Sequence, residues 1–299
     1  MDRKNITKHF SSEIRNALEK IPDSEFTRIQ EIRLRCNRPL SVFSGDLSFT
    51  VAPDGTLSQN SQRKTVTQNE IKYTFESVCQ YSVHSFKNEI RNGFLTVTGG
   101  HRAGICGTAS ADFEKIDNIK NINGINFRIA REVKNCADEI IKKLFSDKKI
   151  RNSVLIAGGV GSGKTTVLRD LARQIGDKIK VCIIDTRGEI AAVCDGQAGC
   201  DVGMFTDVLD SYPKAAGIET AVRVMSPDII ICDEIGSQSE MEAVLYASNC
   251  GVKVIASIHC GEIFTRSDLP PGIFDHIVTL RGAGFPSQVK NISDGDSLK

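Results

Sequence analysis

The sequence has no tryptophan, and aromatic residues make up only 6% of its 299 residues. Aliphatic side chains must therefore form most of the core, and the chain lacks an aromatic platform that could stack the bases of a single-stranded nucleic acid. Lysine and arginine almost balance aspartate and glutamate, which leaves a net charge of +1. The composition thus gives no general electrostatic reason to bind nucleic acid or an anionic membrane.

Long apolar runs are also absent, since none approaches the about 20 residues that a helix needs to span a bilayer. The first residues, Met1 to Asn5, are not followed by the apolar segment of a signal peptide. The ten cysteines form no C-x-x-C pair and no zinc-spaced array with histidine. We expect a cytoplasmic protein with reduced, mostly buried cysteines, which reaches any membrane through partner proteins.

A glycine-rich turn between an apolar run and a helical pattern is the most informative segment of the chain. The apolar run covers residues 153–157, and the apolar residues that follow the turn share one face of a helix. The turn matches the phosphate-binding motif G-x-x-x-x-G-K-[ST] in its usual strand–loop–helix context. The expected nucleotide-binding residues are Gly158, Gly159, Val160, Gly161, Ser162, Gly163, Lys164, Thr165 and Thr166.

The residue types in this loop suit a bound triphosphate. Glycines let backbone N–H groups turn toward the phosphates, and the positive end of the new helix faces the same anion. Lys164 is predicted to neutralise the β- and γ-phosphates, and Thr165 is predicted to bind Mg²⁺. The sequence therefore predicts ATP and Mg²⁺ as cofactors.

A second nucleotide signature follows the apolar run at residues 229–232, where Asp233 and Glu234 stand next to each other. Asp233 is predicted to hold Mg²⁺ together with Thr165. Glu234 is predicted to act as a catalytic general base, because it can reach a water in line with the γ-phosphate.

Two further apolar runs, at residues 180–185 and 251–259, are expected as buried strands. Ligands bind beyond the carboxyl ends of strands in open parallel sheets, so Asp185, Glu189 and His259 are expected near the nucleotide. For His259 the residues leave two alternatives open, a sensor of the γ-phosphate or a packing or hydrogen-bonded residue at the end of its strand.

The residues from 148 to 299 are predicted to form an α/β domain, a doubly wound parallel sheet, because strands alternate with helices there. Helices are expected over about 214–225 and after residue 236, and a strand is expected at 277–280. Residues 194–213, rich in Gly and Asp, are expected as a loop, and the tail from 294 as frayed.

The residues from 1 to 147 are predicted to form a smaller α+β domain, separated from the second by a charged segment at 146–152. An amphipathic helix is expected over 1–21, short strands within 30–51, and a capping box at 67–70. A helix is expected over about 135–145. A strand at 125–130 is expected to present Arg128, with Arg131 just beyond it.

Glycines stand beside two cationic residues in the segment 99–102, which contains His101 and Arg102. Strands are expected on both sides of this segment. It is either a loop directed at an anion or a hairpin turn with solvated charges, and the chemistry of the residues does not decide between the two.

Several of these segments are similar to the stage III sporulation protein AA family, P-loop ATPases related to the motor ATPases of type II and type IV secretion and of type IV pili. The similarity covers about residues 10–290. It is carried by residues 99–107 (GGHRAGICG), 127–133, the P-loop, 184–191 (IDTRGEIA), 207–210 (DVLD) with Pro213 and Lys214, and 223–228 leading into 233–236 (DEIG).

The resemblance implies an N-terminal α+β domain and a RecA-like motor domain that work in a ring, a hexamer, with ATP between subunits. In such rings the N-terminal domain supplies arginines to the nucleotide, which gives Arg128, Arg131 and Arg102 an expected catalytic role. Residues 185–189 correspond to the family's acidic box and His259 to its histidine box. The chain departs from the acidic pattern at Thr186 and Gly188, and the retained Glu189 is a rival to Glu234 as general base.

The implied setting is the mother cell of an endospore former, where the ATPase would power or gate a channel complex through integral membrane partners. Two other functions remain as alternatives. A nucleic-acid-acting RecA-like ATPase is disfavoured because the chain lacks a basic stripe. A nucleotide-gated scaffold with little turnover is disfavoured by Glu234. We expect neither nucleic-acid binding nor direct insertion into a bilayer.

Overall fold

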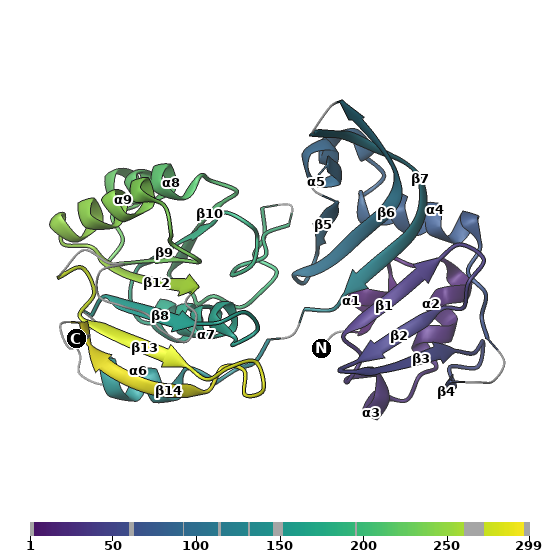
Figure 1. The fold of residues 1–299 in the computed structure, drawn as a ribbon, viewed down its shortest axis with the longest axis horizontal. Helices are drawn as coiled ribbons and strands as arrows, with labels where there is room; N and C mark the ends of the chain where they lie inside the picture. The colour runs from purple at the N-terminus through teal and green to yellow at the C-terminus, as the bar shows by residue number, and fades with distance from the viewer. Residues whose placement is uncertain are drawn as a thin grey trace. The chain divides into compact units, whose positions relative to one another are not determined.

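The structure, a computed structural model, describes residues 3–59, 63–91, 93–112, 115–130, 132–145, 152–194, 196–259 and 272–295. The chain divides into two compact units, Met1–Arg131 and Glu132–Lys299 (Figure 1). The sequence predicts this boundary later, at 147/148. The predicted linker at 146–152 lies outside the described residues except for Asn152.

Helix α6 (Asp138–Leu144) explains why the division comes earlier than predicted. Ala137, Ile140 and Leu144 are buried in the same apolar cluster as the strands and the first long helix of the second unit. A charged segment after the helix suggested a boundary, but the apolar face of the helix determines the unit to which it belongs.

The first unit is built on a seven-stranded antiparallel sheet with the order β4-β3-β2-β1-β7-β6-β5. Its strands are β1 (Glu31–Arg35), β2 (Ser41–Ser44), β3 (Leu47–Val51), β4 (Leu57–Ser58), β5 (Phe94–Val97), β6 (His101–Asp112) and β7 (Lys115–Arg128). Its helices are α1 (Arg3–Thr7), α2 (Ser12–Glu19), α3 (Asp23–Phe26), α4 (Gln68–Val78), the 3₁₀ helix Val83–Phe86 and α5 (Lys87–Arg91). The predicted α+β class and the short strands within 30–51 are confirmed.

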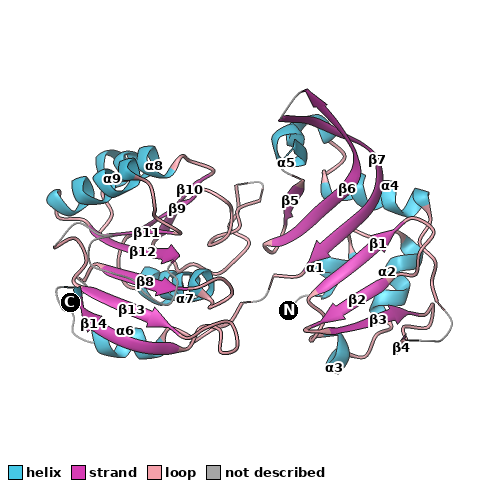
Figure 2. Ribbon diagram, in the orientation of Figure 1, coloured by secondary structure: helices cyan, strands magenta, loops and turns pink. Residues whose placement is uncertain are grey.

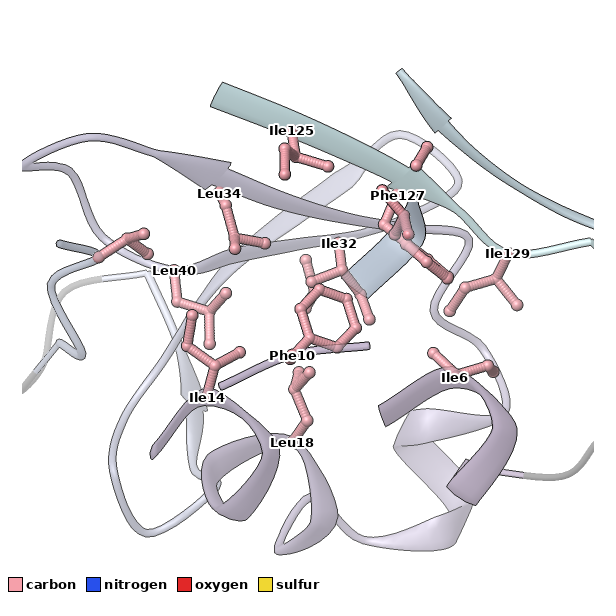
Figure 3. Close-up of a cluster of buried hydrophobic side chains, with 14 of the residues drawn as sticks. Ile6, Phe10, Ile14, Leu18, Ile32, Leu34, Leu40, Ile125, Phe127 and Ile129 are labelled. Atoms are coloured by element: carbon pink, nitrogen blue, oxygen red, sulfur yellow. The ribbon is translucent and has the colours of Figure 1, made fainter. Parts of the chain in front are cut away.

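The N-terminal segment forms two helices, so the prediction of one helix over residues 1–21 is wrong. Ser11 interrupts the helix because its side chain accepts the N–H of Ile14 at 3.5 Å and caps the start of α2. The predicted apolar face is nevertheless correct: its members are buried and point toward the sheet (Figure 3). They are Ile6, Phe10, Ile14 and Leu18, and they pack in one cluster with Ile32, Leu34, Ile125 and Phe127.

The capping box predicted at residues 67–70 is confirmed at the start of α4. The Thr67 hydroxyl accepts the N–H of Glu70 at 3.3 Å, and the Glu70 carboxylate accepts the N–H of Thr67 at 2.8 Å. Lys64 pairs with the same carboxylate at 3.0 Å. These contacts fix the residue at which α4 begins.

The second unit contains a seven-stranded sheet with the order β10-β9-β11-β12-β8-β13-β14 (Figure 2). All neighbouring strands are parallel except β13 and β14. The strands are β8 (Val154–Gly158), β9 (Val181–Asp185), β10 (Thr206–Asp210), β11 (Ile229–Cys232), β12 (Lys253–His259), β13 (His276–Leu280) and β14 (Val289–Asp294). Besides α6, the helices are α7 (Lys164–Gly176), α8 (Lys214–Thr220), the π-helix Ala221–Met225 and α9 (Gln238–Asn249).

Alternate residues of the central strands face two separate apolar cores, one on each side of this sheet. In β8, Val154 and Ile156 belong to the core with α6 and α7, whereas Leu155 and Ala157 belong to the core with α8 and α9. Helices thus cover both faces (Figure 2). The predicted doubly wound parallel sheet is confirmed, and its strand ends bring together residues far apart in the chain.

Two strands of this sheet differ from the sequence expectations. Residues 194–213, expected as a loop, contain β10, which pairs in parallel with β9 over five residues. β14 was not expected, and it pairs antiparallel with β13 up to Asp294. Both strands are partly polar edge strands, so a search for continuous apolar runs does not find them. Among the described residues, none of the helices is both long and apolar enough to cross a membrane.

Candidate nucleotide-binding site

The glycine-rich turn connects the carboxyl end of β8 to the first residue of α7. Gly163 caps α7 with a φ of 89°, a left-handed conformation that strongly favours glycine. Ser162 is fully buried and donates to the Gly159 carbonyl at 2.9 Å. A side chain on Gly158 would overlap the Ser162 hydroxyl. The turn is therefore compact, and glycine is required where the motif places it.

Lys164, at the start of α7, lies with its side chain inside this turn. The residue is 7% exposed, and its ammonium donates to the carbonyl oxygens of Gly158 and Gly159, both at 3.0 Å. A buried ammonium needs partners of this kind, because taking a charge out of water is costly. The positive charge of Lys164 thus lies within the turn, where the motif is expected to bind phosphate.

Thr165 and Asp233 are 68 residues apart in the sequence and are in direct contact in the structure. The Thr165 hydroxyl donates to Asp233 Oδ2 at 2.9 Å, and the Ser257 hydroxyl donates to Asp233 Oδ1. Carboxylate and hydroxyl oxygens are the ligands that Mg²⁺ prefers. The donor set at this edge of the sheet therefore fits a magnesium ion held with a nucleotide.

Glu234 is held by three contacts in an uncommon backbone conformation. Its φ is 40°, a left-handed value that is strained for a residue other than glycine and occurs often at functional sites. Its N–H donates to the Ser257 hydroxyl at 2.9 Å, and its carbonyl accepts from Lys214. Its carboxylate accepts from Arg187 at 3.1 Å. Ser257 therefore positions both acids of the pair.

Asp185, at the end of β9, is a structural residue rather than an exposed acid. It is 2% exposed and accepts four backbone N–H groups, from Glu189 (2.8 Å), Ile190 (3.1 Å), Ala191 (2.8 Å) and Ala192 (3.3 Å). The loop after β9, which carries Arg187 and Glu189, is folded around this carboxylate. Glu189 is half-buried, and its carbonyl accepts from Arg169 at 2.5 Å.

We expect Asp185→Asn to lower the free energy of unfolding of the protein by about 2–3 kcal/mol, because one amide oxygen cannot accept what two carboxylate oxygens accept. The NH₂ group of Asn would also face N–H donors. Urea unfolding measures the effect. Asp207→Asn, at an exposed position of β10, is the matched control and should change stability by less than about 0.5 kcal/mol. Equal stability of the two variants would contradict the assigned role.

His259 is the last residue of β12 and lies opposite Gly158 in the parallel pairing with β8. The residue is exposed, so it does not pack in the core, and the hydrogen-bonded and phosphate-sensing alternatives both stay open. The histidine stands beside the first residue of the P-loop, and a role as γ-phosphate sensor stays a prediction.

The first unit brings Arg102 and Arg128 together, since they are directly paired residues of β6 and β7. Arg128 lies 3.4 Å from the Glu31 carboxylate, and the Arg102 guanidinium lies 4.9 Å from the ring centre of Phe94. Arg131 lies outside the described residues. The two arginines thus occupy paired positions on neighbouring strands of one unit, Arg128 is paired there with Glu31, and a role of either toward a nucleotide stays a prediction.

His101 does not add a positive charge beside these two arginines. It is 6% exposed, and its Nδ1 accepts the N–H of Ala130 at 3.0 Å. Burial, together with the positive charge of Lys8, lowers the pKa of His101 to about 4, so the imidazole is neutral at pH 7. The segment 99–102 is thus a turn at Gly99 and Gly100 followed by a strand, and Arg102 alone carries charge there.

Sequence reasoning gave no role to four residues that shape the site. Arg187, Ser257 and Lys214 contact Asp233 or Glu234, and the N–H of Ser287 donates to the P-loop carbonyl of Ser162 at 2.7 Å. Ser257 lies near the carboxyl end of its strand, and in an open parallel sheet this position could have indicated a place in the site. Ser287 lies between two strands of which one was not expected, and the sequence contains no signal for its contact.

Comparisons with known proteins identify the family and the fold. The stage III sporulation protein AA of Bacillus subtilis (strain 168) is 32% identical over 296 residues, which cover 95% of this chain and 92% of the relative. The ATPase DotB of Legionella pneumophila aligns with a TM-score of 0.54 and 16% identity over 86% of this chain and 73% of its own. The pilus retraction motor PilT, solved with bound ADP, aligns with a TM-score of 0.54 and 17% identity over 90% and 76%.

The two structural similarities show the fold, a RecA-like P-loop unit preceded by an α+β unit. The family is shown by sequence, because residues 1–298 match the family described as sporulation stage III, protein AA. Together with the relative from Bacillus subtilis, this match covers both units. The chain therefore belongs to the sporulation stage III, protein AA family.

Proposed function

We propose that this protein hydrolyses ATP and works as the motor or gate of a sporulation channel complex. The observation that carries the proposal is the contact of Thr165 with Asp233 beside the buried ammonium of Lys164. This contact brings the residues proposed to bind Mg²⁺ next to the lysine proposed to bind phosphate. Support also comes from the fold shared with DotB, which is an ATPase, and with PilT, which is a motor.

In the proposed mechanism the backbone N–H groups of residues 158–166 and the Lys164 ammonium bind the phosphates. Thr165 and Asp233 would hold Mg²⁺, which when bound would screen the charge of the β- and γ-phosphates. Ser257 keeps Asp233 in place through the hydrogen bond to Oδ1. These hydrogen bonds would hold the two proposed metal ligands in position before a nucleotide binds.

We assign the general base to Glu234 rather than to its rival Glu189. The contacts of Glu234 with Ser257 and Lys214 fix its main chain directly beside the metal ligand Asp233. Its carboxylate is paired with Arg187, at a position where both side chains reach solvent. Opening of this ion pair would free the carboxylate to take a proton from the attacking water. His259, beside Gly158, would detect the γ-phosphate.

The arginines of the first unit would act on the nucleotide of a neighbouring subunit in a ring, a hexamer in this proposal. Arg102 and Arg128, with Arg131, would stabilise the charge that grows on the γ-phosphate, as arginines supplied in trans do in other NTPases. Loss of that phosphate would release them and let the two units reorient. Integral membrane components in the mother cell would couple this motion to a channel, and the ATPase would remain cytoplasmic and peripheral.

The molar mass of the protein in solution, measured by light scattering, tests the ring. With Mg²⁺ and a non-hydrolysable ATP analogue, we expect the mass to rise from the 32.7 kDa monomer toward about six times that value, since cations of one subunit would close over the phosphates of the next. Lys164→Ala should stay at the lower mass. A wild-type protein that hydrolyses ATP at constant mass would rule out a ring assembled by nucleotide, and a ring without turnover would favour the scaffold.

A further inference from the structure

The loop between β13 and β14, residues 281–288, packs directly against the P-loop. The N–H of Ser287 donates to the Ser162 carbonyl at 2.7 Å, and a side chain on Gly163 would overlap the Ser287 main chain and hydroxyl. At Gly161, a β-carbon would lie 3.2 Å from that of Ala283. Two glycines of the P-loop thus have this loop as their neighbour, so the loop lines the same site.

The loop has a defined conformation and presents an aromatic ring. Arg281 and Gln288 close it through an N–H···O bond of 2.8 Å, and the N–H of Phe285 donates to Gly282 at 2.9 Å. Phe285 is 56% exposed, and the Arg281 guanidinium lies 5.9 Å from its ring centre. Aromatic residues are few in this chain, and an exposed ring can stack on a nucleobase. A neighbouring arginine can add a cation–π contribution to such a stack.

The strand order indicates which end of a nucleotide faces this loop. Asp233 follows β11, which lies on one side of β8 beyond β12, whereas β13 lies on the other side of β8. The metal-binding end of the triphosphate belongs with Thr165 and Asp233. The nucleoside lies at the opposite end of the triphosphate and is therefore expected away from Asp233 and β11. The loop after β13 borders the P-loop on that side.

We propose that Phe285, supported by Arg281, is the stacking platform for the purine base of the bound nucleotide; this inference rests on the proposed ATP site. A shallow hollow near the P-loop, lined by residues of 132–134 and of α7 near Thr166, encloses only about 10 Å³, the space of about one water molecule.

The absence of tryptophan makes a direct test possible, because Phe285→Trp would contain a single tryptophan as a fluorescent reporter. With Mg²⁺ present, we expect ATP to quench its emission through stacking, and inorganic tripolyphosphate, which has no base, to leave the emission unchanged. Phe205→Trp is the matched control, since Phe205 is 50% exposed in the same unit just before β10. Its emission should respond to neither ligand.

Affinities measured by calorimetry complete the test. Phe285→Ala should weaken ATP binding by about tenfold, in the range of one lost base–aromatic stack, and leave tripolyphosphate binding unchanged. If wild type binds ATP but Phe285→Ala binds it equally well, or if tripolyphosphate also quenches Phe285→Trp, the platform is refuted while the ATP site stands. If wild type binds no ATP, the proposed function itself fails.

Discussion

Lys164→Ala is expected to reduce the affinity for ATP at least about a hundredfold, which isothermal titration calorimetry would record as loss of measurable binding. Hydrogen bonds to charged groups contribute about 1.5–3 kcal/mol each, and the Lys164 ammonium would form at least two with the β- and γ-phosphates. Because turnover depends on binding, ATP hydrolysis should disappear with it.

A control for this variant must remove one positive charge without touching the P-loop. Lys178→Ala meets that need, since Lys178 is exposed and lies just beyond the other end of α7. It should bind ATP like wild type. The Gly158 and Gly159 carbonyls lose their partner in Lys164→Ala, so thermal unfolding must show that the variant is folded. Wild-type ATP affinity in a folded Lys164→Ala protein would eliminate the proposed phosphate site.

Glu234→Gln is expected to bind ATP but to turn it over at least about 100-fold more slowly, the usual scale for a lost general base. Glutamine keeps the size of the side chain and the main-chain contacts with Ser257 and Lys214, so the fold of the site should remain. Its amide cannot accept the proton of the attacking water. A single-turnover measurement of phosphate release, with ATP affinity measured in parallel, separates the chemical step from binding.

The rival base is tested in the same assay through Glu189→Gln. This variant should retain most of the turnover if Glu234 is the base, because the main chain of Glu189 remains held by Asp185 and Arg169. Glu242→Gln, at an exposed position of α9, controls for the loss of one carboxylate. Slow turnover in Glu189→Gln together with normal turnover in Glu234→Gln would transfer the assignment to Glu189.

Local patterns were sufficient to predict most of the second unit. The runs that became β8, β9, β11 and β12 are almost entirely apolar, because central parallel strands are buried on both faces. β10 was missed because it has only two apolar residues, Val208 and Leu209, between Asp207 and Asp210, and an edge strand of this kind lacks the continuous apolar run of a central strand. The division at 131/132 was missed because the apolar face of α6 matters more than the charged segment after it.

The sequence predicted those parts of the site whose positions follow from the carboxyl ends of the parallel strands. Once Thr165 and Asp233 follow parallel strands of one sheet, their side chains meet at the same edge. The conformation of the loops beyond those strands could not be predicted, since it depends on contacts between distant residues. Asp185 illustrates the limit: its position was predicted, but only the folded loop shows that backbone N–H groups occupy both of its oxygens.

Strand β10 has a consequence for the solubility of the protein at high concentration. It lies at one end of the sheet of the second unit, where the outer backbone groups of a strand can pair with another molecule. Asp207 and Asp210 place carboxylates on this short strand, and the edge of a second β10 would bring like charges close together. Intermolecular sheet extension, the first step toward fibrous aggregation, is therefore disfavoured here.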